Sequence, residues 1–353
     1  MNFPLSEELT TRFYKWEARG RGRHVFEFPV DLEPQFYPFF GHFVLKPQPI
    51  DDGKHPTLLS TIVDLFKNNK KPVENRYTAA DDIPAVTALE TIFENGLVAY
   101  SIVLPKDAKL EAEDMEHLLL MLSYTSKTLS FEIIATATTI KTQFVCHEND
   151  AANLHSQVKA YFPVAIITKD ERRLDFLGDN LETCVIELGL AEEFMRPIAM
   201  IGQAEKDPFI GLFASLEHLQ NEEQGTVQIL FKGAINPWAE SIMRSVTDNK
   251  GGSFFADAPE MVKLAQEKIS SPLYAVCIRV VGQAEEASRA IEIAKNISIT
   301  LTRVSKSKSN TLVILKQDDM EIDEMIGDVY LRQSHRLGML LNSQELATIV
   351  HFP

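Results

Sequence analysis

Apolar runs separated by short polar turns fill residues 207–315, and their pattern predicts alternating helices and strands. Residues 226–232 alternate apolar and polar side chains, which is typical of a strand with one buried face. Residues 273–281 are almost wholly apolar, so we expect a central strand that is covered on both faces. Along 285–300, apolar residues recur every three or four positions, which predicts a helix with one buried stripe. Helices that each bury a stripe against a common sheet indicate an α+β fold.

The region before residue 202 has a similar pattern. It predicts the following elements: helices at 85–94, 111–124 and 151–161, and strands at 97–104, 131–138, 139–147 and 164–167. The order strand, strand, helix, strand resembles part of a split βαβ, ferredoxin-like unit. The predicted fold is therefore α+β, with two sheet-plus-helix lobes that are partly ferredoxin-like and an extended N-terminal arm. We place the arm at 1–50, the first lobe at 51–204, the second lobe at 205–340 and a junction at 341–353.

The predicted arm combines basic and aromatic side chains and has little periodicity. A set of five basic and aromatic residues forms its candidate contact surface: Lys15, Trp16, Arg19, Arg21 and Arg23. One interpretation is contact with nucleic acid or with a membrane surface. A second is that the aromatic side chains dock on the body of the protein while the arginines stay in solvent. A third is a juxtamembrane segment, because Lys and Arg are enriched on the cytoplasmic flank of membrane spans.

Composition narrows these alternatives. The 353-residue chain carries a formal charge of -15, which disfavours a broad nucleic-acid-binding face but leaves room for a local basic patch. Its three cysteines, Cys146, Cys184 and Cys277, are scattered in apolar runs, so we expect buried free thiols. No apolar run reaches the roughly 18 residues that a membrane-spanning helix needs. The N-terminus also lacks the apolar segment of a secretory signal.

Motifs for catalysis are missing from the sequence. It contains no Gly-x-x-x-x-Gly-Lys-Ser/Thr phosphate-binding loop, no serine-hydrolase elbow and no His-Glu-x-x-His helix. Cys146 and His147 are adjacent, but neighbouring strand residues point to opposite faces and so do not readily share a ligand. We therefore predict no catalytic residue, no cofactor and no metal. A small enzyme whose site is assembled from residues distant in sequence stays the weaker alternative.

Two stretches carry a resemblance to a known family. Residues 13–22 (FYKWEARGRG), followed by 29–34 (PVDLEP) and Pro38-Phe39, resemble the opening of large type IV secretion or conjugative DNA-transfer ATPases. Residues 341–353 (LNSQELATIVHFP) are similar to the segment just before the ATPase domain of those proteins. In the family, a HerA/FtsK-like P-loop motor follows and drives DNA or protein through a hexameric ring. The motor motifs are not in these 353 residues, so no catalytic residue of the family carries over.

The resemblance implies a non-catalytic N-terminal domain that assembles or docks a DNA-translocating ATPase. The expected partners are further copies of the chain, hexameric in the full protein, a C-terminal ATPase domain and a membrane secretion complex, with DNA contact through the arm left open. The expected location is the cytoplasm or the cytoplasmic face of the membrane. At the junction to the motor, the candidate contacts are Glu345, Leu346, His351 and Phe352.

Overall fold

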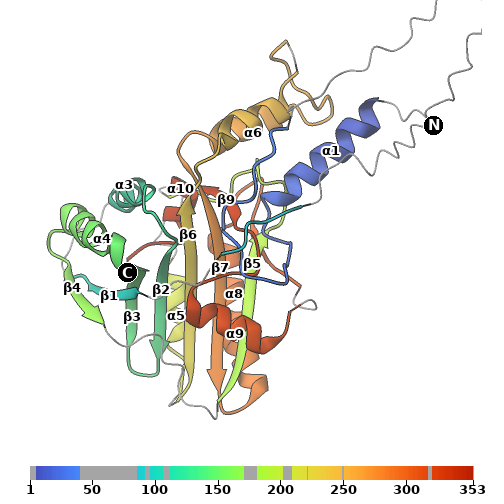
Figure 1. Cartoon of the computed structure of the whole chain (residues 1–353). Coiled ribbons are helices and arrows are strands. Elements are labelled where there is room, and N and C mark those ends of the chain that lie inside the picture. The colour runs from blue at the N-terminus through green and yellow to red at the C-terminus, as the bar shows by residue number, and fades with distance from the viewer. Residues whose placement is uncertain are drawn as a thin grey trace, which may run out of the picture.

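The computed structural model describes residues 5–39, 86–91, 96–105, 112–170, 181–201, 209–220, 222–248, 250–316 and 320–352. Within these ranges, helices pack on a large sheet (Figure 1). The helices are α1 (Leu5–Arg19), α3 (Ala112–Leu122), α4 (Glu148–Tyr161), α5 (Phe209–Leu216), α6 (Trp238–Val246), α7 (Met261–Lys268), α8 (Ala287–Val304), α9 (Ile322–Leu331) and α10 (Ser343–Ala347). The strands are β1 (Leu97–Val103), β2 (Leu129–Thr136), β3 (Ile140–His147), β4 (Ile166–Asp170), β5 (Glu182–Leu190), β6 (Gln224–Gly233), β7 (Leu273–Ala284), β8 (Leu312–Ile314) and β9 (Met339–Asn342). The predicted α+β class is confirmed.

All nine strands of the described ranges belong to one antiparallel sheet. Its order is β4-β1-β3-β2-β6-β7-β5-β8, and β9 pairs with β7 outside this path. One edge of β7 pairs with β6, while the other edge pairs with β9 along 273–276 and with β5 along 278–284. Every residue of β7 is buried. The long apolar run in the sequence therefore marks the central strand, as predicted.

The sheet consists of two units with the same connectivity. In the first unit, β1, α3, β2, β3, α4 and β4 follow one another and give the order β4-β1-β3-β2. In the second, β5, α5, β6, β7, α8 and β8 give the same order in reverse, β6-β7-β5-β8, with α6 and α7 inserted before β7. The third strand of each unit lies between the first two and is antiparallel to both. The units meet where β2 pairs with β6.

The junction between the two parts differs from the predicted boundary at 204/205. That boundary assigns β5 to the first lobe, but β5 pairs with β7 and β8 of the second unit. The junction therefore lies between Asp170 and Glu182. The sequence pattern identifies β5 as a strand, but it holds no information about which neighbour the strand pairs with. Buried side chains of the two units belong to one hydrophobic core.

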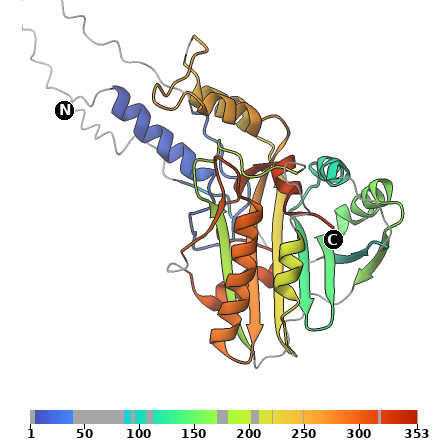
Figure 2. The ribbon, with the colours of Figure 1, turned by 180° about the vertical axis from the view of Figure 1, so that it is seen from behind.

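One face of the sheet is apolar and carries most of the helices. Phe131, Ile229 and Ile278 lie in register on this face and are fully buried. Figure 2 shows α8 and α5 lying over it. The contact with α8 is close at Gly282, where an added Cβ would lie 2.2 Å from the carbonyl oxygen of Ala290. A larger residue at position 282 would therefore push α8 off the sheet.

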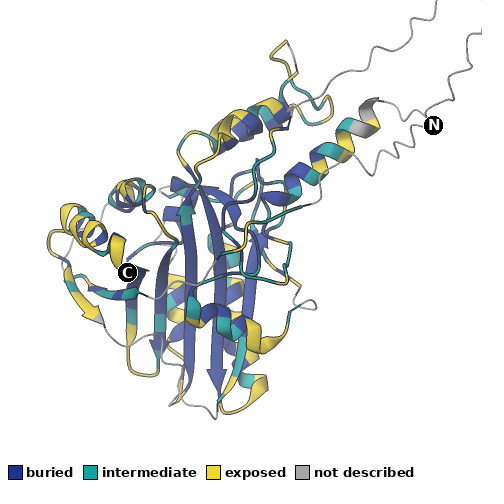
Figure 3. Cartoon of the chain, in the orientation of Figure 1, coloured by how far each residue is buried: buried dark blue, intermediate teal, exposed yellow. Residues whose placement is uncertain are grey.

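The opposite face is covered unevenly. Over the second unit, α9 packs through a small cluster in which Val185 and Val281 meet Met325 and Val329 (Figure 1). Over the first unit, Val103 of β1 and its neighbour Ile166 of β4 are 56% and 60% exposed. Figure 3 shows the exposed positions along β4. The two units thus have the same connectivity but different cover.

The predicted extended arm is a helix over its first part, and this corrects the prediction. Residues 5–19 form α1, which lies beside α6 (Figure 1). Phe13 and Trp16 are buried, with the Trp16 ring 6.2 Å from that of Trp238. Glu17 and Arg19 are buried as well, at 2% exposure each. The helix escaped prediction because these buried charges interrupt the apolar stripe by which a helix is recognised.

The segment after α1 runs along the last part of the chain. Backbone hydrogen bonds join the Gly20 oxygen to the Leu340 nitrogen (3.1 Å) and the Leu32 oxygen to the Gly338 nitrogen (2.8 Å). Residues 86–91 then lie beside Val30, which forms a bridge with Glu90. The predicted helix at 85–94 is therefore wrong within 86–91, because these residues are held by backbone pairing to the N-terminal segment. The rest of the predicted arm, residues 40–50, lies outside the described residues. In the described part of the chain, the helices are all too short or too polar to cross a membrane.

Candidate functional site

A row of polar side chains crosses the α9 face of the sheet. Gln143 (β3), Glu132 (β2), Gln228 (β6), Arg279 (β7) and Glu187 (β5) lie directly opposite one another in successive strands. Each is at most 2% exposed. Buried polar groups are costly unless they are hydrogen-bonded, and buried charges unless they are paired. This row, with the segment that covers it, is the candidate functional site.

The carboxylate of Glu132 is the centre of the first half of the row. Its Oε1 accepts hydrogen bonds from Ser130 Oγ (2.8 Å), Gln228 Nε2 (3.0 Å) and Arg332 Nε (3.0 Å). Its Oε2 accepts from Gln143 Nε2 (2.7 Å) and from Arg332 Nη2 (3.3 Å). Arg332 thus pairs with Glu132 through two nitrogens, the strong side-on geometry for an arginine and a carboxylate.

The guanidinium of Arg279 is the centre of the second half. Its Nη1 donates to Gln228 Oε1 (3.1 Å), its Nε lies 3.3 Å from Glu187 Oε1, and its Nη2 lies 3.5 Å from Asp328 Oδ2. Glu187 also accepts a hydrogen bond from Arg336 Nε. Burial alone would lower the pKa of Arg279, but nearby negative charges, among them Asp328 and Glu187, raise it above its usual value. The charged residues of the row are therefore each paired with an opposite charge, and Gln228 bridges Glu132 and Arg279.

The segment that covers the row begins at the end of α9. Arg332 ends the helix in the left-handed conformation (φ 53°), and the Gln333 nitrogen donates back to the Asp328 oxygen at 3.2 Å. A left-handed residue reverses the chain direction after a helix. The reversal places Arg332, His335 and Arg336 over the sheet. His335 Nδ1 lies 2.9 Å from Asp328 Oδ1, so the covering segment is also bonded back to α9.

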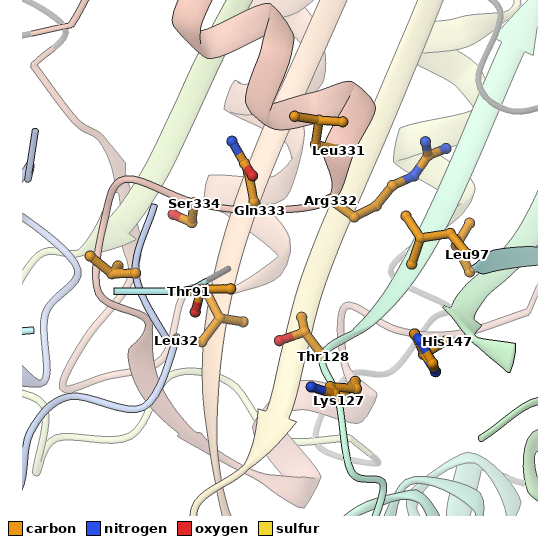
Figure 4. A pocket seen from close by; sticks show the side chains of 12 residues that line it. Leu32, Thr91, Leu97, Lys127, Thr128, His147, Leu331, Arg332, Gln333 and Ser334 are labelled. Carbon is orange, nitrogen blue, oxygen red and sulfur yellow. The ribbon is translucent and has the colours of Figure 1, made fainter. Parts of the chain in front are cut away.

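A cavity of about 110 Å³ lies at the first unit's end of this row (Figure 4). Apolar side chains such as Leu32, Leu97 and Val145 line it, together with the polar side chains of Lys127, Thr128 and His147. Figure 4 shows the guanidinium of Arg332 turned away from Lys127 and Thr128. Nδ1 of His147 caps α4 by accepting from the Asn149 nitrogen (3.2 Å). The neutral imidazole therefore carries its proton on Nε2, which makes that atom a donor.

This arrangement is suited to holding segments together. Each carboxylate of the row accepts bonds from two or more donors, whereas a general base needs a free lone pair aimed at its substrate. Within the described ranges, no three His, Cys, Asp or Glu side chains are grouped so that they could hold a metal ion. The cysteines are free thiols, with Cys146 and Cys277 buried and Cys184 half-buried. The chemistry of the row is thus mutual neutralisation.

The five arm residues do not form one basic surface. Trp16 and Arg19 are buried, Lys15 is half-buried and Arg23 is exposed. Arg21 donates to the carbonyl oxygens of Ala191 and Glu192, and Arg23 to those of Leu190 and Ala191. The docking of the aromatic side chains agrees with the second interpretation of the arm. The arginines, however, bond to the protein or are buried rather than lying in solvent.

The junction residues are also mostly interior. Glu345, Leu346 and Phe352 are at most 1% exposed, and His351 is half-buried. Glu345 completes a capping box with Asn342 and pairs with the fully buried Lys268, whose Nζ lies 2.7 Å from Oε2. Burial lowers the pKa of Lys268, while the charge of Glu345 raises it.

The ring of Phe352 packs edge-on against Phe162 at 5.1 Å. The last stretch therefore belongs to the core of the fold.

Sequence reasoning missed the row itself. A signal was present, since each of the five strands carries a charged or amide side chain next to an apolar residue. Those residues meet only once the register of five strands is known, and a shift of one residue would send each to the other face. Sequence alone does not give that register. The row therefore emerges only from the pairing of the strands.

Comparison with known proteins gives one match. A family model described as a domain of unknown function (DUF8128) matches residues 111–251. The search of curated proteins returned no match to the chain. The matched region runs from α3 to the end of α6, so it includes the β2–β6 contact between the two units and four of the five residues of the row. Arg279 and the covering segment lie beyond it. The family description names no activity.

Proposed function

We propose that this chain is a non-catalytic assembly and docking domain of a type IV secretion-like DNA-translocating ATPase. The proposal rests on the resemblance of residues 13–22, 29–34 and 38–39, and of residues 341–353, to such proteins. The observation that supports it best is the coupling of these two stretches, which lie about 300 residues apart in the chain. A backbone bond from the Leu340 nitrogen to the Gly20 oxygen (3.1 Å) ties the first stretch to the residue directly before the second. Both stretches that resemble the family are thus parts of the same folded unit. This is what we expect of a domain whose role is structural.

The burial of the signature residues supports the same reading. Trp16, Glu345, Leu346 and Phe352 all lie in the interior. Side chains in such positions specify packing rather than contact with a partner. Both units are, in this proposal, ferredoxin-like modules, an inference supported by the split βαβ order of each. The chain would act in the cytoplasm or at the cytoplasmic face of a membrane secretion complex.

The first unit offers a surface for assembly with further copies of the chain. β4 is the outer strand of the described sheet, and the neighbouring side chains Ile166 and Val103 are more than half exposed. An exposed apolar edge strand is a template for pairing with another chain. We propose that this edge carries self-association.

Self-association is tested by analytical ultracentrifugation over a range of protein concentrations. We expect the wild type to form oligomers and Ile166→Lys to shift toward the monomer. Ile235→Lys is the matched control, because Ile235 is 82% exposed and lies far from β4 in the sequence of strands. A wild type that stays monomeric at all concentrations, or an Ile235→Lys effect as large as that of Ile166→Lys, would contradict the proposal.

The motor part of the proposal has its own test. A Gly-x-x-x-x-Gly-Lys-Ser/Thr motif in the reading frame after Pro353 would support it, and this chain by itself should hydrolyse no ATP. A gene that stops at Pro353 and a product that hydrolyses ATP alone would contradict it.

The alternative of a nucleic-acid- or membrane-binding arm finds less support, because Arg19 is buried and Arg21 and Arg23 bond to backbone carbonyls. No DNA binding even at low salt would dispose of it.

A further inference from the structure

The side chain of Arg19 is buried without the partner that a buried cation needs. It lies in the last turn of α1 and is 2% exposed. Its Cζ lies 4.7 Å from the ring centroid of Tyr37, so one face of the guanidinium stacks on an aromatic ring. Its Nε and Nη2 are both buried and find no hydrogen-bond acceptor within the part of the chain that the structure describes. Arginine keeps its charge in proteins, so the side chain cannot relieve this by losing a proton.

The other buried cations of the described ranges provide the contrast. They are Lys268, Arg279, Arg332 and Arg336, and each pairs with a buried carboxylate. An isolated buried charge is strongly destabilising, which is why such charges are normally paired. Arg19 is the exception. The groups whose charges shift its pKa are Tyr37 and Arg12, and among those described no carboxylate is included.

The nearest carboxylate in sequence, Glu17, serves another arginine. Its Oε1 lies 2.9 Å from Nε of Arg21. Residues two apart on a helix do not face each other, so Glu17 and Arg19 point to different sides of α1. Burial is the main reason why the pKa of His24 is lowered, and the charges of Arg19 and Arg336 lower it further. The corner formed by Arg19, His24 and Tyr37 is therefore electropositive in a chain of net charge -15.

The two unpaired nitrogens of Arg19 define the geometry of a ligand. Nε–H and one N–H of Nη2 are parallel and form the side edge of the guanidinium, which binds two oxygens of a carboxylate or phosphate at once. Trp16 lies three residues earlier, on the same helix face, and its Nε1 is a buried donor that also finds no acceptor in the described ranges. Three donors from neighbouring side chains thus call for a group that only accepts.

We propose that the Nε/Nη2 edge of Arg19 binds a small oxyanion, either inorganic phosphate or sulfate or a small carboxylate. Tyr37 supports the guanidinium from one face, and His24 lies within the field of its charge. The C-terminal carbonyls of α1 compensate the charge in part, since cations are favoured at helix C-termini, but they leave the side edge unpaired. Because the side chain is enclosed, the ion is held inside the fold and stabilises it. This site is independent of the proposed assembly function.

The test compares thermal unfolding of the full chain in chloride, phosphate, sulfate and acetate at equal ionic strength and pH. A ligand that binds only the folded state raises Tm with its concentration. We expect at least one of the oxyanions to raise Tm of the wild type by several degrees over chloride. An effect of phosphate and sulfate alone assigns a tetrahedral ion, and an effect of acetate assigns a carboxylate.

The variants decide whether Arg19 is responsible. Arg19→Lys keeps the charge but loses the two parallel donors, so the rise in Tm should be lost. Arg244→Lys is the matched control, because Arg244 is exposed and pairs with Glu240 on α6, and it should keep the full rise. If Arg19→Lys fails to fold, crystals of the wild type soaked in selenate provide the second measurement. An anomalous peak within hydrogen-bond distance of Nε and Nη2 is expected.

Three results would overturn the site. One is a wild type whose Tm does not depend on the anion. Another is an equal rise in Arg19→Lys, and the third is the absence of a selenate peak at Arg19.

Discussion

The two units of the sheet have the same strand order, but the α9 face is covered by α9 over the second unit and is open at the outer strands β1 and β4 of the first. In the second unit, Glu187 and Arg279 are buried beneath α9 and the segment after it. In the first unit, Val103 and Ile166 are largely exposed on that face. The charged residues are inside and apolar ones outside, the reverse of the usual distribution. The difference teaches that cover, and not strand order, decides what a face of this sheet can carry.

The cover itself contains two kinds of buried charge. Arg332 and Arg336, over the sheet, pair with Glu132 and Glu187. Glu17 and Arg19, which project from different sides of α1, are as deeply buried but less well neutralised. The buried charges over the sheet thus all have partners of opposite charge, whereas those at α1 are only partly paired. Four comparisons of variants test how burial and charge pairing contribute to stability in these regions.

The largest effect is expected for Glu187→Ala. It leaves Arg336 and Arg279 short of one buried carboxylate, which costs about 3–5 kcal/mol of unfolding free energy. Ser101→Ala is the matched control. Ser101 lies in β1, the strand of the first unit that corresponds to β5, and it stands opposite Gln143 of β3. We expect it to cost about 0.5 kcal/mol or less. Urea unfolding measures both. Equal losses would mean that the two units do not differ in the way described.

Glu17 predicts a dependence of stability on pH. Burial raises the pKa of Glu17 to about 7 from its usual 4.5. Between these values the folded state binds more protons than the unfolded state, so stability falls as pH rises through the window. We expect the wild type to lose roughly 2–3 kcal/mol between pH 5 and pH 8 relative to Glu17→Gln, which lacks this titration. Urea unfolding of both proteins at several pH values measures this. The assignment would be disproved if the unfolding free energy of the wild type and that of Glu17→Gln changed equally with pH.

A smaller effect is expected for Arg19→Met in chloride buffer. The change removes an unpaired buried charge, which stabilises, and the stacking on Tyr37, which is worth about 0.5–1 kcal/mol. The removed charge outweighs the lost stacking, so the variant should be about 1–2 kcal/mol more stable than the wild type. Arg332→Met is the matched comparison and should cost about 3–5 kcal/mol, because it leaves the carboxylate of Glu132 without its cation. Similar losses in the two variants would show that Arg19 has a partner equivalent to Glu132.

The smallest effect is expected for Ile166→Thr on the open face of the first unit. Ile166 is 60% exposed, so the unfolding free energy should change by about 0.5 kcal/mol or less. The same kind of change at a covered position, Val185→Thr, buries a hydroxyl in the cluster under α9 and should cost about 1–3 kcal/mol. A large loss for Ile166→Thr would mean that the face is covered in the folded protein.

Much of the fold could be predicted because the central strands are long apolar runs. The strand expected at 226–232 is β6 (Gln224–Gly233), and the one at 273–281 is β7 (Leu273–Ala284). The helix expected at 285–300 is α8, whose stripe contains Ala290, Ala294 and Ile297. These elements carry their own signal, because each buries a regular set of side chains.

The elements that escaped prediction depend on distant partners. α1 contains charges on its buried side, and residues 86–91 take their conformation from pairing with the N-terminal segment. The row can be recognised only when the register of five strands is known, because each strand supplies one of its residues, such as Glu132 from β2 and Arg279 from β7. Two charged residues among the candidate contacts, Arg19 and Glu345, are both interior. A sequence shows which side chains are charged but not which of them the fold encloses.

The place of β9 has a consequence for synthesis on the ribosome. On one edge, the first third of β7 pairs with β9. The carbonyl oxygen of Gly20 accepts its hydrogen bond from the amide nitrogen of Leu340 in the same strand β9. In a nascent chain, the bond between Gly20 and Leu340 therefore forms only after both residues, about 320 positions apart, have been translated. Until β9 has been translated, the edge of β7 along 273–276 has no partner strand, and unpaired strand edges favour aggregation. β9 therefore completes both the sheet and its contact with the segment after α1.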